Sequence, residues 1–451
     1  MRAAVFFLSI VFLVFSGSAQ AQSIIPLAQK GGLHAAYVVP VDTFDRVDVQ
    51  LIVLSGSYDD PDPSGTAHLT EHLAAFSADA TILRKPRERD IYATTHNVAT
   101  VYTNSGLPSE AEMLLRLSRA VLDTPSVSRQ FAESEVAIVQ RETLLRERQY
   151  PFRWLSRMAL QNLYGTLRGR ADNTVEDLPK LSLEKAYQFH KEHYVPSNVT
   201  LIVSGNIEPA RAEELVARVF GDTEPSDAPK KPWLDQKPDP EKQSVVRLQS
   251  DRLQRDTVLF AKFVEFEDRS TSIDMQGAFF IASGILNERI AKVLRHEDTR
   301  ILNHGVNWYF AKNADVELVI DLQLMPGFSV DEAKDLLTET LAGLLDEPIS
   351  KYEIHQLRQK EVVWSQNMAR RPSAFLWFLQ NVAADGFPPI SPSVFAETLS
   401  NTTDQEVIDF AEKILQPSAT SFVLAEKADG HARFQGPASR SSLCGAYLAA
   451  G

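Results

Sequence analysis

The sequence repeats itself once, at an offset of a little over two hundred residues. Residues 183–203 and 404–424 each hold a helix-like segment with a phenylalanine, a proline–serine pair seven residues after it, and then an apolar, β-branched segment. Earlier in each half, residues 122–136 and 345–359 match at nearly the same offset. Two matches in the same order and with similar spacing indicate an internal duplication, so the chain is expected to fold as two copies of one domain.

The segment between the two copies differs from both in composition. Residues 222–243 are rich in proline and charge and poor in apolar side chains, which is typical of a linker. We therefore predict two related α+β domains at residues 22–221 and 244–430, followed by a polar tail at 431–451. A chain of 451 residues is also too long for one ordinary hydrophobic core, which favours this division.

Residue patterns in the first domain predict the order of its elements. Residues 46–60 form an apolar strand that ends in a turn, and residues 65–77 open the helix that follows. Residues 97–106 form a second strand, and the apolar spacing of residues 109–123 is helical.

The N-terminal segment predicts export. Arg2 precedes a short apolar run, and Ala19 and Ala21 form an A-x-A pattern, so residues 1–21 are predicted to be a signal peptide. That run is too short to span a bilayer comfortably and no later stretch is long enough, so we expect an exported protein without a membrane span, periplasmic if the source is a Gram-negative bacterium. The one cysteine, Cys444, allows no internal disulfide, and its pairing with another chain stays open.

The charge balance argues against nucleic acid as a partner. The formal net charge is −13, and no basic stripe runs along the sequence. Proteins that bind nucleic acids usually carry such a stripe, because phosphates dominate their binding energy.

Two of the ten histidines lie four residues apart within the segment GTAHLTEHLAAFS at residues 65–77. In a helix, His68 and His72 project from one face a single turn apart, and Glu71 lies beside them. This arrangement predicts two metal ligands with a general base next to the metal. The segment that matches by the repeat offset, residues 287–298, has no comparable histidine pair, so the site is expected in the first domain alone.

A catalytic zinc site usually has three protein ligands, and the third can be distant in the sequence. Residues 131–148 offer Glu135 and Glu142, which are seven residues apart and therefore share one face of a helix. Either carboxylate could approach the histidines. A carboxylate that does not bind the metal could instead accept the ring N–H of a histidine ligand and fix its tautomer.

The H-x-x-E-H order, the E-x6-E helix after it, and the duplicated domain resemble the insulinase/pitrilysin family of zinc metallopeptidases, in its two-domain bacterial, processing-peptidase-like form. The resemblance implies one zinc ion per chain on His68, His72 and Glu142, with Glu71 as general base and Glu135 as a carboxylate behind the ligands. It also implies two homologous α+β domains, each a mainly antiparallel sheet covered by helices, which together form half of a clamshell chamber.

The resemblance also implies which residues contact a peptide substrate. The family's edge strand often reads N-A-x-T; residues 92–95 read YATT, which keeps Ala93 and Thr95. Active members usually supply an arginine and, seven residues later, a tyrosine from the second domain. Residues 294–310 offer Arg300 and Tyr309 at a different spacing, so either this pair serves or a partner chain supplies one.

Two functions stay open from the sequence. The first is a zinc endopeptidase that cuts short or unfolded peptides, acting as a homodimer or as a heterodimer with a related two-domain chain. The second is a family subunit that has a structural role or becomes active only when a partner docks. The intact motif favours the first, and the irregular spacing of Arg300 and Tyr309 favours the second.

Overall fold

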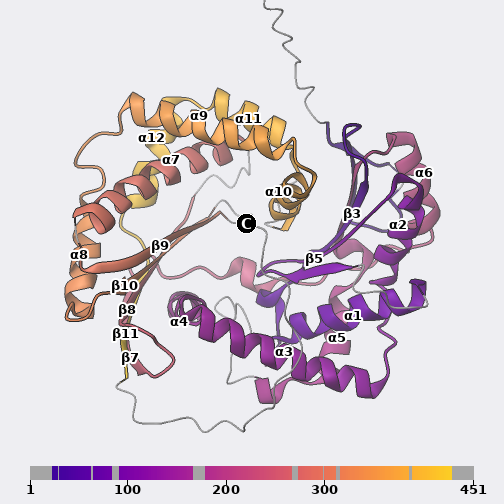
Figure 1. Ribbon diagram of the computed structural model, residues 1–451, viewed down its shortest axis with the longest axis horizontal. Coiled ribbons are helices and arrows are strands. Elements are labelled where there is room, and N and C mark those ends of the chain that lie inside the picture. Colours follow the sequence, from indigo (N-terminus) through magenta and orange to yellow (C-terminus); the bar gives the residue numbers. More distant parts are fainter. Residues whose placement is uncertain are drawn as a thin grey trace, which may run out of the picture.

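The computed structural model of the chain contains two β-sheets, each covered by helices (Figure 1). It describes residues 23–28, 30–61, 64–83, 91–165, 178–266, 273–297, 299–310, 315–384 and 389–428. The predicted signal peptide at 1–21, the tail at 431–451 and Cys444 lie outside these residues. Among the described residues, none of the helices combines the length and apolar character needed to cross a membrane.

The first sheet consists of six strands in the order β1-β2-β6-β3-β5-β4 within the described part of the chain. Their bounds are β1 (Ile25–Pro26), β2 (Ala35–Pro40), β3 (Val47–Val53), β4 (Tyr92–Thr95), β5 (Thr100–Gly106) and β6 (Val199–Gly205). β2 and β6 run parallel, and every other pair is antiparallel. β4 therefore forms one edge of this sheet.

The second sheet repeats that arrangement in the order β7-β11-β8-β10-β9. Its strands are β7 (Gln243–Ser250), β8 (Thr257–Val264), β9 (Ile301–Phe310), β10 (Val316–Leu324) and β11 (Thr420–Lys427). β7 and β11 run parallel and the remaining pairs are antiparallel. Strand for strand, β2, β6, β3, β5 and β4 correspond to β7, β11, β8, β10 and β9. The predicted α+β class with two similar, mainly antiparallel sheets is confirmed.

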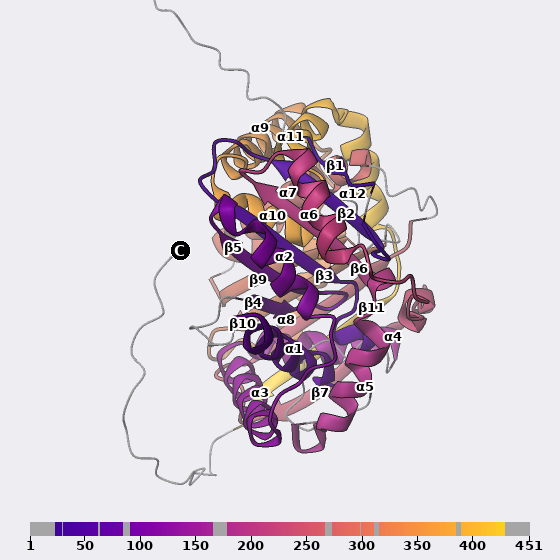
Figure 2. The same ribbon diagram turned by 90° about the vertical axis from the view of Figure 1, so that its right-hand side faces the viewer.

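Helices α1, α2, α5 and α6 cover one face of the first sheet, and Figure 2 shows α2 and α6 in front of it. The helices of this half are α1 (Thr66–Leu83), α2 (Ala111–Ala120), α3 (Arg129–Gln149), α4 (Pro151–Tyr164), α5 (Leu183–His193) and α6 (Pro209–Phe220). Alternate residues of β3 (Val47, Val49, Leu51, Val53) face the core under these helices. This core holds α1 in a fixed position against the sheet.

The second half uses corresponding helices. They are α7 (Ile273–Ala291), which continues as a π-helical turn (Lys292–Glu297), α8 (Val330–Ala342), α9 (Lys351–Met368), α10 (Pro372–Ala384), α11 (Pro392–Asn401) and α12 (Asp404–Leu415). Side chains of α7, α8, α9, α11 and α12 pack with one face of the second sheet in a single apolar core. The repeated segment predicted from the sequence is the pair α5–β6 in one half and α12–β11 in the other.

Each half sends one helix to the sheet of the other half. α4 packs Leu155 and Ala159 against Leu259 and Val423 of the second sheet. α10 packs Phe375 and Leu379 against strands β3, β5 and β6 of the first sheet, where Figure 1 shows it beside the first half. The exchanged helices cover apolar faces that each sheet would otherwise expose, so they tie the two halves together.

Candidate metal centre

The helix that carries the histidine motif begins at a well-formed cap. The Asp60 carboxylate accepts hydrogen bonds from the backbone N–H of Gly65 at 2.6 Å and of Ala67 at 2.5 Å. Gly65 has a φ of 96°, a conformation that glycine adopts without steric penalty. An acidic side chain at this position satisfies free N–H groups and interacts favourably with the helix dipole, so it fixes the first turn of α1.

His68, Glu71 and His72 lie within the first two turns of α1 and are buried, with 6%, 7% and 8% of their surfaces exposed. The Glu142 carboxylate of α3 meets them: its Oε2 is 3.4 Å from His68 Nε2 and 3.9 Å from His72 Nε2. One donor atom from each of His68, His72 and Glu142 lies within 4.8 Å of the others.

These separations fit a metal ion of the size of zinc. Nitrogen and oxygen ligands bind zinc at about 2.0–2.2 Å, and two ligands in tetrahedral geometry are then about 3.4 Å apart. The His68–Glu142 distance already has that value, and a small side-chain movement would bring His72 to it. Two imidazoles and one carboxylate also form a common donor set of catalytic zinc sites.

Glu135 orients one of the histidines. Its Oε2 lies 2.7 Å from His72 Nδ1, and its side chain is buried. When Nδ1–H donates this hydrogen bond, the lone pair of Nε2 is free on the side of the ring that faces Glu142. The two glutamates predicted from their spacing therefore lie at the histidines in different places, Glu142 in the donor cluster and Glu135 behind it.

The electrostatics of the cluster favour a positive charge. Burial lowers the pKa of His72, but its hydrogen bond to Glu135 and the charges of Glu71, Glu142 and Glu135 outweigh burial and raise the pKa overall. The hydrogen bond from His68, opposed by burial and supported by the charges of His68, His72 and Arg146, lowers the pKa of Glu142 to about 2. Ionised carboxylates that stabilise a protonated imidazole would stabilise a metal cation in the same way.

Glu71 is connected to the edge strand of the first sheet. The Thr95 hydroxyl donates a hydrogen bond of 2.8 Å to Glu71 Oε2. Ala93, two residues earlier on β4, packs against the core on the same side as α1. Tyr92 is 68% exposed, and β4 has a neighbour on one side only within the described sheet. Thr95 therefore lies against the carboxylate predicted to be the base.

The two residues predicted from the second domain do not lie together. Arg300 immediately precedes β9, and its guanidinium lies 4.1 Å from the ring centre of Phe328. Tyr309 lies near the far end of β9 and is 43% exposed. Because a strand rises about 3.3 Å per residue, the two backbone positions are roughly 30 Å apart. Their role in substrate binding stays a prediction, but they cannot hold one substrate group as a pair.

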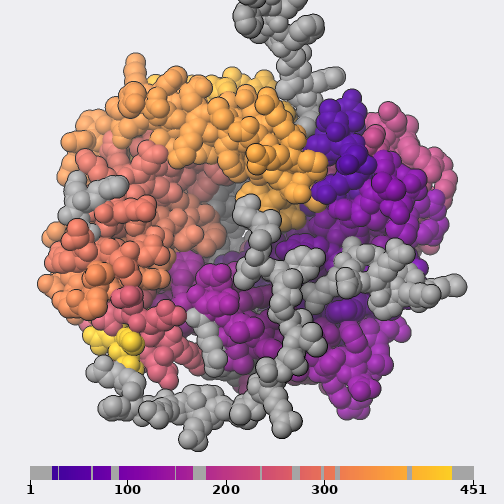
Figure 3. Space-filling view, in the orientation of Figure 1, coloured from indigo at the N-terminus to yellow at the C-terminus, as the bar shows by residue number. Residues whose placement is uncertain are grey.

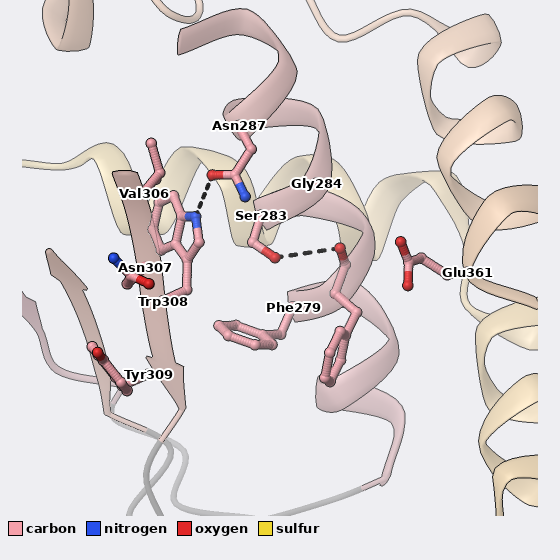
Figure 4. A pocket seen from close by; sticks show the side chains of 10 residues that line it. Phe279, Ser283, Gly284, Asn287, Val306, Asn307, Trp308, Tyr309 and Glu361 are labelled. Atoms are coloured by element: carbon pink, nitrogen blue, oxygen red, sulfur yellow. Dashed lines mark hydrogen bonds between the residues drawn. The ribbon is translucent and has the colours of Figure 1, made fainter. Parts of the chain in front are cut away.

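Tyr309 borders a cavity of about 330 Å³ between α7, α9 and β9, shown in Figure 4. In the fold, this cavity occupies the position in the second half that the donor cluster occupies between α1, α3 and β4. Its walls are mostly apolar or amide side chains, including Phe279, Phe280 and Asn287, which accepts a hydrogen bond of 2.7 Å from Trp308 Nε1.

The caps of α3 and α9 align the two sites. Ser128 and Ser350 each accept a hydrogen bond from the backbone N–H three residues later. Counted from these caps, Glu135 and Glu142 correspond to Leu357 and Trp364. The helix that corresponds to α1 is α7, which begins at Ile273, so the predicted match at residues 287–298 was placed too late in the chain. The sequence offset is not constant: it is 207 residues between the starts of α1 (66) and α7 (273) and 222 between the starts of α3 (129) and α9 (351), because the segment from α7 to α9 is longer than the segment from α1 to α3.

Asp60 is a functional residue of the site that the sequence patterns described above did not indicate. An acidic residue before the first turn of a helix is a recognised start signal, and it could have identified this cap. The pairing of Thr95 with Glu71 has no such signal, because residues 24 positions apart meet only in the folded chain.

The fold and the donor set together define an α+β protein with two similar sheets and a cluster of two histidines and one glutamate that could hold a metal ion. Residues 180–361 match the family described as "Peptidase M16 inactive domain". A "zinc protease YmfH" of Bacillus subtilis, described as uncharacterized, is 25% identical over 211 residues, which are 46% of this chain and 47% of that protein. The match thus spans about half the length of this relative. These matches support the likeness to the insulinase/pitrilysin family, also called peptidase family M16, that the sequence motif indicated.

Solved structures share the fold over nearly the whole chain. A protease from Helicobacter pylori superimposes with a TM-score of 0.74 at 15% identity, covering 90% of this chain and 100% of that one. The first half of the periplasmic protease PqqL from Escherichia coli gives a TM-score of 0.66 at 16% identity, covering 91% and 93%. At these identities the likeness establishes the fold alone.

Proposed function

We propose that the chain is a zinc-dependent endopeptidase. The observation that carries the proposal is the cluster of His68, His72 and Glu142, whose donor atoms lie within 4.8 Å of one another. Glu71 lies between the two histidines on helix α1. Glu135 behind His72 completes the arrangement. A chain that kept only the fold would have no physical reason to hold this many ionisable groups together in a buried place.

The chain's own residues supply binding, orientation and proton transfer. When bound, zinc lowers the pKa of a water ligand and polarises the carbonyl of the peptide bond. Glu71 accepts a proton from the attacking water and returns it to the amine nitrogen that leaves. The Thr95 hydroxyl holds Glu71 Oε2, so the other carboxylate oxygen is available for this proton. Glu135 keeps His72 in the tautomer that presents Nε2.

The proposed substrate is an extended peptide. β4 offers a free edge beside Glu71, and a peptide that pairs with this edge would pass close to the metal ligands. The halves meet around a central hollow in the space-filling view of Figure 3. Strand pairing requires an extended main chain, so short or unfolded peptides are the expected class.

We also propose that the protein is exported and acts as a dimer. The signal-like residues 1–21 support export, to the periplasm if the source is a Gram-negative bacterium. Dimerisation is supported by the correspondence of this chain to one half of PqqL. The partner is a second copy or a related two-domain chain. A partner would also supply an arginine–tyrosine pair, because Arg300 and Tyr309 lie at opposite ends of β9.

A second candidate function is a subunit without activity of its own. It is supported by the description of the matching family as an inactive domain and by the separation of Arg300 from Tyr309. The two candidates differ in one respect that can be tested, since only the first requires hydrolysis by this chain.

The test is hydrolysis of a mixed library of fluorogenic peptides by the purified, zinc-loaded mature chain, with Glu71→Gln as its matched control. Glutamine keeps the shape of the side chain but cannot accept the proton, so the rate should fall by about 10²–10⁴-fold while zinc stays bound. Normal turnover by Glu71→Gln would contradict the proposed role of Glu71 as general base. Silence of the unaltered chain with one tightly bound zinc would favour a partner-dependent subunit, and silence without zinc would favour a structural role.

A further inference from the structure

The segment predicted to be a linker holds the loop that leads into the metal-binding helix. This pre-helix loop is defined here as residues 54–61, between β3 and α1. Lys231 Nζ donates hydrogen bonds to Ser55 Oγ at 3.0 Å and to Asp59 Oδ2 at 3.1 Å. Trp233 Nε1 donates to the other oxygen of the same carboxylate, Asp59 Oδ1, at 2.8 Å. Both oxygens of Asp59 are therefore held by the linker.

The contact is buried. The side chain of Asp59 is 2% exposed and that of Lys231 is 16% exposed, while Trp233 as a residue is 7% exposed. The ring of Trp233 also packs edge-on against the ring of Tyr58, with centres 5.5 Å apart. Hydrogen bonds of this kind contribute more in a buried site than ion pairs on the surface do, because solvent does not screen them and a lost partner leaves a buried charge unsatisfied.

From the pre-helix loop, the contacts continue to the proposed active site. Asp60, the neighbour of Asp59, caps the first turn of α1 through Gly65 and Ala67. The N–H groups of Ser57 and Tyr58 donate to the carbonyl oxygens of residues 96 and 97, in the turn between β4 and β5. One short loop therefore joins the linker to the metal-binding helix and to the end of the edge strand.

The other side of the loop is fixed to the body of the first half. Ser55 Oγ lies 2.9 Å from His193 Nδ1 at the end of α5, and it accepts a hydrogen bond of 2.9 Å from Asn198 Nδ2. Ser55 is fully buried. The linker cation thus enters a network that is already rigid on its inner side, and its loss would free mainly the outer part of the loop, at Asp59 and Asp60.

We propose that Lys231 and Trp233 are positioning residues for the metal site: they hold the pre-helix loop so that α1 and β4 keep their relative placement. The linker joins the last helix of the first half, α6, to the first strand of the second half, β7. We call the contacts of Lys231 and Trp233 with Ser55 and Asp59 the clamp. The clamp therefore couples the position of the second half to the geometry of the metal site in the first half. The inference rests on the proposed function for its catalytic meaning.

The experiment compares two variants of these positioning residues with two matched controls, all in the full mature chain, and adds Lys231→Arg for the kinetic readout. Trp233→Phe keeps the ring beside Tyr58 but removes the N–H that binds Asp59, and Lys231→Met keeps the aliphatic stem but removes the charge. The matched controls are Trp377→Phe, at an exposed tryptophan of α10, and Lys237→Met, at a linker lysine that pairs with Glu265 instead.

The first readout is amide hydrogen exchange of residues 56–67 in the metal-free chain, which requires neither zinc nor activity. Trp233→Phe loses one hydrogen bond and Lys231→Met loses two, so exchange there should be at least about fivefold faster in both, with no change in the controls. The second readout is the zinc dissociation constant. The zinc dissociation constant should rise by about threefold or more. The increase should stay below the roughly 10–100-fold that is expected when a residue that contacts a metal ligand is lost.

Kinetics separate a positioning role from a general loss of stability. Looser placement of β4 should raise KM for peptides more than it lowers kcat, and Lys231→Arg, which keeps the charge, should restore both values. Exchange equal to that of the controls in both clamp variants would overturn the inference. If the unaltered chain neither binds zinc nor cuts peptides, the proposed function fails, while the exchange measurement still decides whether the clamp exists. If Trp233→Phe does not fold, hydrogen exchange in Lys231→Met alone tests whether the clamp exists.

Discussion

The site between α1, α3 and β4 and the site between α7, α9 and β9 have the same place in two copies of one fold, yet their side chains differ in kind. In the first half, two buried histidines contact the buried Glu135 and the partly exposed Glu142 at distances of 2.7 Å (His72–Glu135) and 3.4 Å (His68–Glu142). In the second half, the same place is a cavity of about 330 Å³ bordered mainly by aromatic and amide side chains, with one carboxylate, Glu361, and no histidine among its lining residues. The two halves therefore share the architecture of the site but not its proposed ligands.

The difference shows what each site must do to stay folded. Buried ionisable groups are destabilising unless each finds a partner, so the first site depends on a closed set of pairings. In the second site, Leu357 takes the position of Glu135 and belongs to the apolar core. A β-carbon added to Gly284 of α7 would come within 2.8 Å of the Leu357 side chain, so the two helices are packed closely there. One site is held by polar partners and the other by packing.

The largest expected effect is a loss of zinc affinity that follows a change in the first half but not a change in the second half. His68→Ala removes one of three proposed ligands, so zinc affinity and hydrolysis should each fall by more than about 100-fold, which exceeds the usual loss for residues behind a ligand. His304→Ala on β9 of the second half is the matched control and should keep one zinc per chain. Zinc analysis after dialysis and peptide turnover measure both. Retention of zinc by His68→Ala would contradict the assigned ligand set.

The next effect tests the packed site. Leu357 is 2% exposed, so Leu357→Ala should lower the free energy of unfolding by about 2–5 kcal/mol through lost contacts and a cavity. Zinc affinity should not change, since Leu357 belongs to the apolar core of the second half and does not contact the proposed ligands. Val363→Ala, at a 52% exposed position of the same helix, should change stability by less than about 0.5 kcal/mol. Denaturant unfolding gives both values, and a loss of zinc in Leu357→Ala would show that the halves are not independent.

The smallest effect concerns buried carboxylates in the two sheets. Burial raises the pKa of Asp321 on β10 from 3.8 to about 6. The folded state thus binds this proton more tightly than the unfolded state, and the resulting stabilisation is full below pH 3.8 and is lost as pH rises through about 6. Asp321→Asn should therefore raise the free energy of unfolding by about 1–3 kcal/mol at pH 8 and change it little at pH 4.

Asp48 on β3 is the comparison in the first half. Burial raises the pKa of Asp48 too, but its hydrogen bonds with Ser105 and Arg46 act in the opposite direction. Asp48→Asn should therefore give a smaller gain or a loss at pH 8, because it gives up the interaction with Arg46. Unfolding curves at pH 4 and pH 8 measure the free energy of unfolding of both variants. Equal gains for Asp48→Asn and Asp321→Asn would show that Ser105 and Arg46 do not stabilise the charge of Asp48.

The sequence was sufficient where the evidence was periodic or local. The repeat predicted two similar halves, and the family fold agrees. The four-residue spacing of His68 and His72 fixed their common helix face, and the seven-residue spacing of Glu135 and Glu142 fixed theirs. Helical geometry alone therefore brought together candidates for the metal site. It did not reveal which glutamate approaches both histidines, since that depends on how α3 crosses α1.

Other features required contacts between distant segments. The hydrogen bond from Thr95 to Glu71, the exchange of α4 and α10 between the sheets, and the burial of Trp233 have no local pattern in the sequence. A tryptophan in a stretch of proline and charged residues gave no indication that its N–H would meet Asp59. The separation of Arg300 from Tyr309 along β9 was likewise visible only once that segment proved to be one extended strand.

By itself, the sequence determined which residue types could form a metal site and that the domain occurs twice, because helix and strand periods are set by backbone geometry within a few residues. The tertiary structure alone decided that the donor atoms converge, that each half covers a face of the other, and that the linker holds the loop before α1. Those outcomes depend on burial and on packing between segments far apart in the chain, where the gain in free energy comes from contacts that no local pattern specifies.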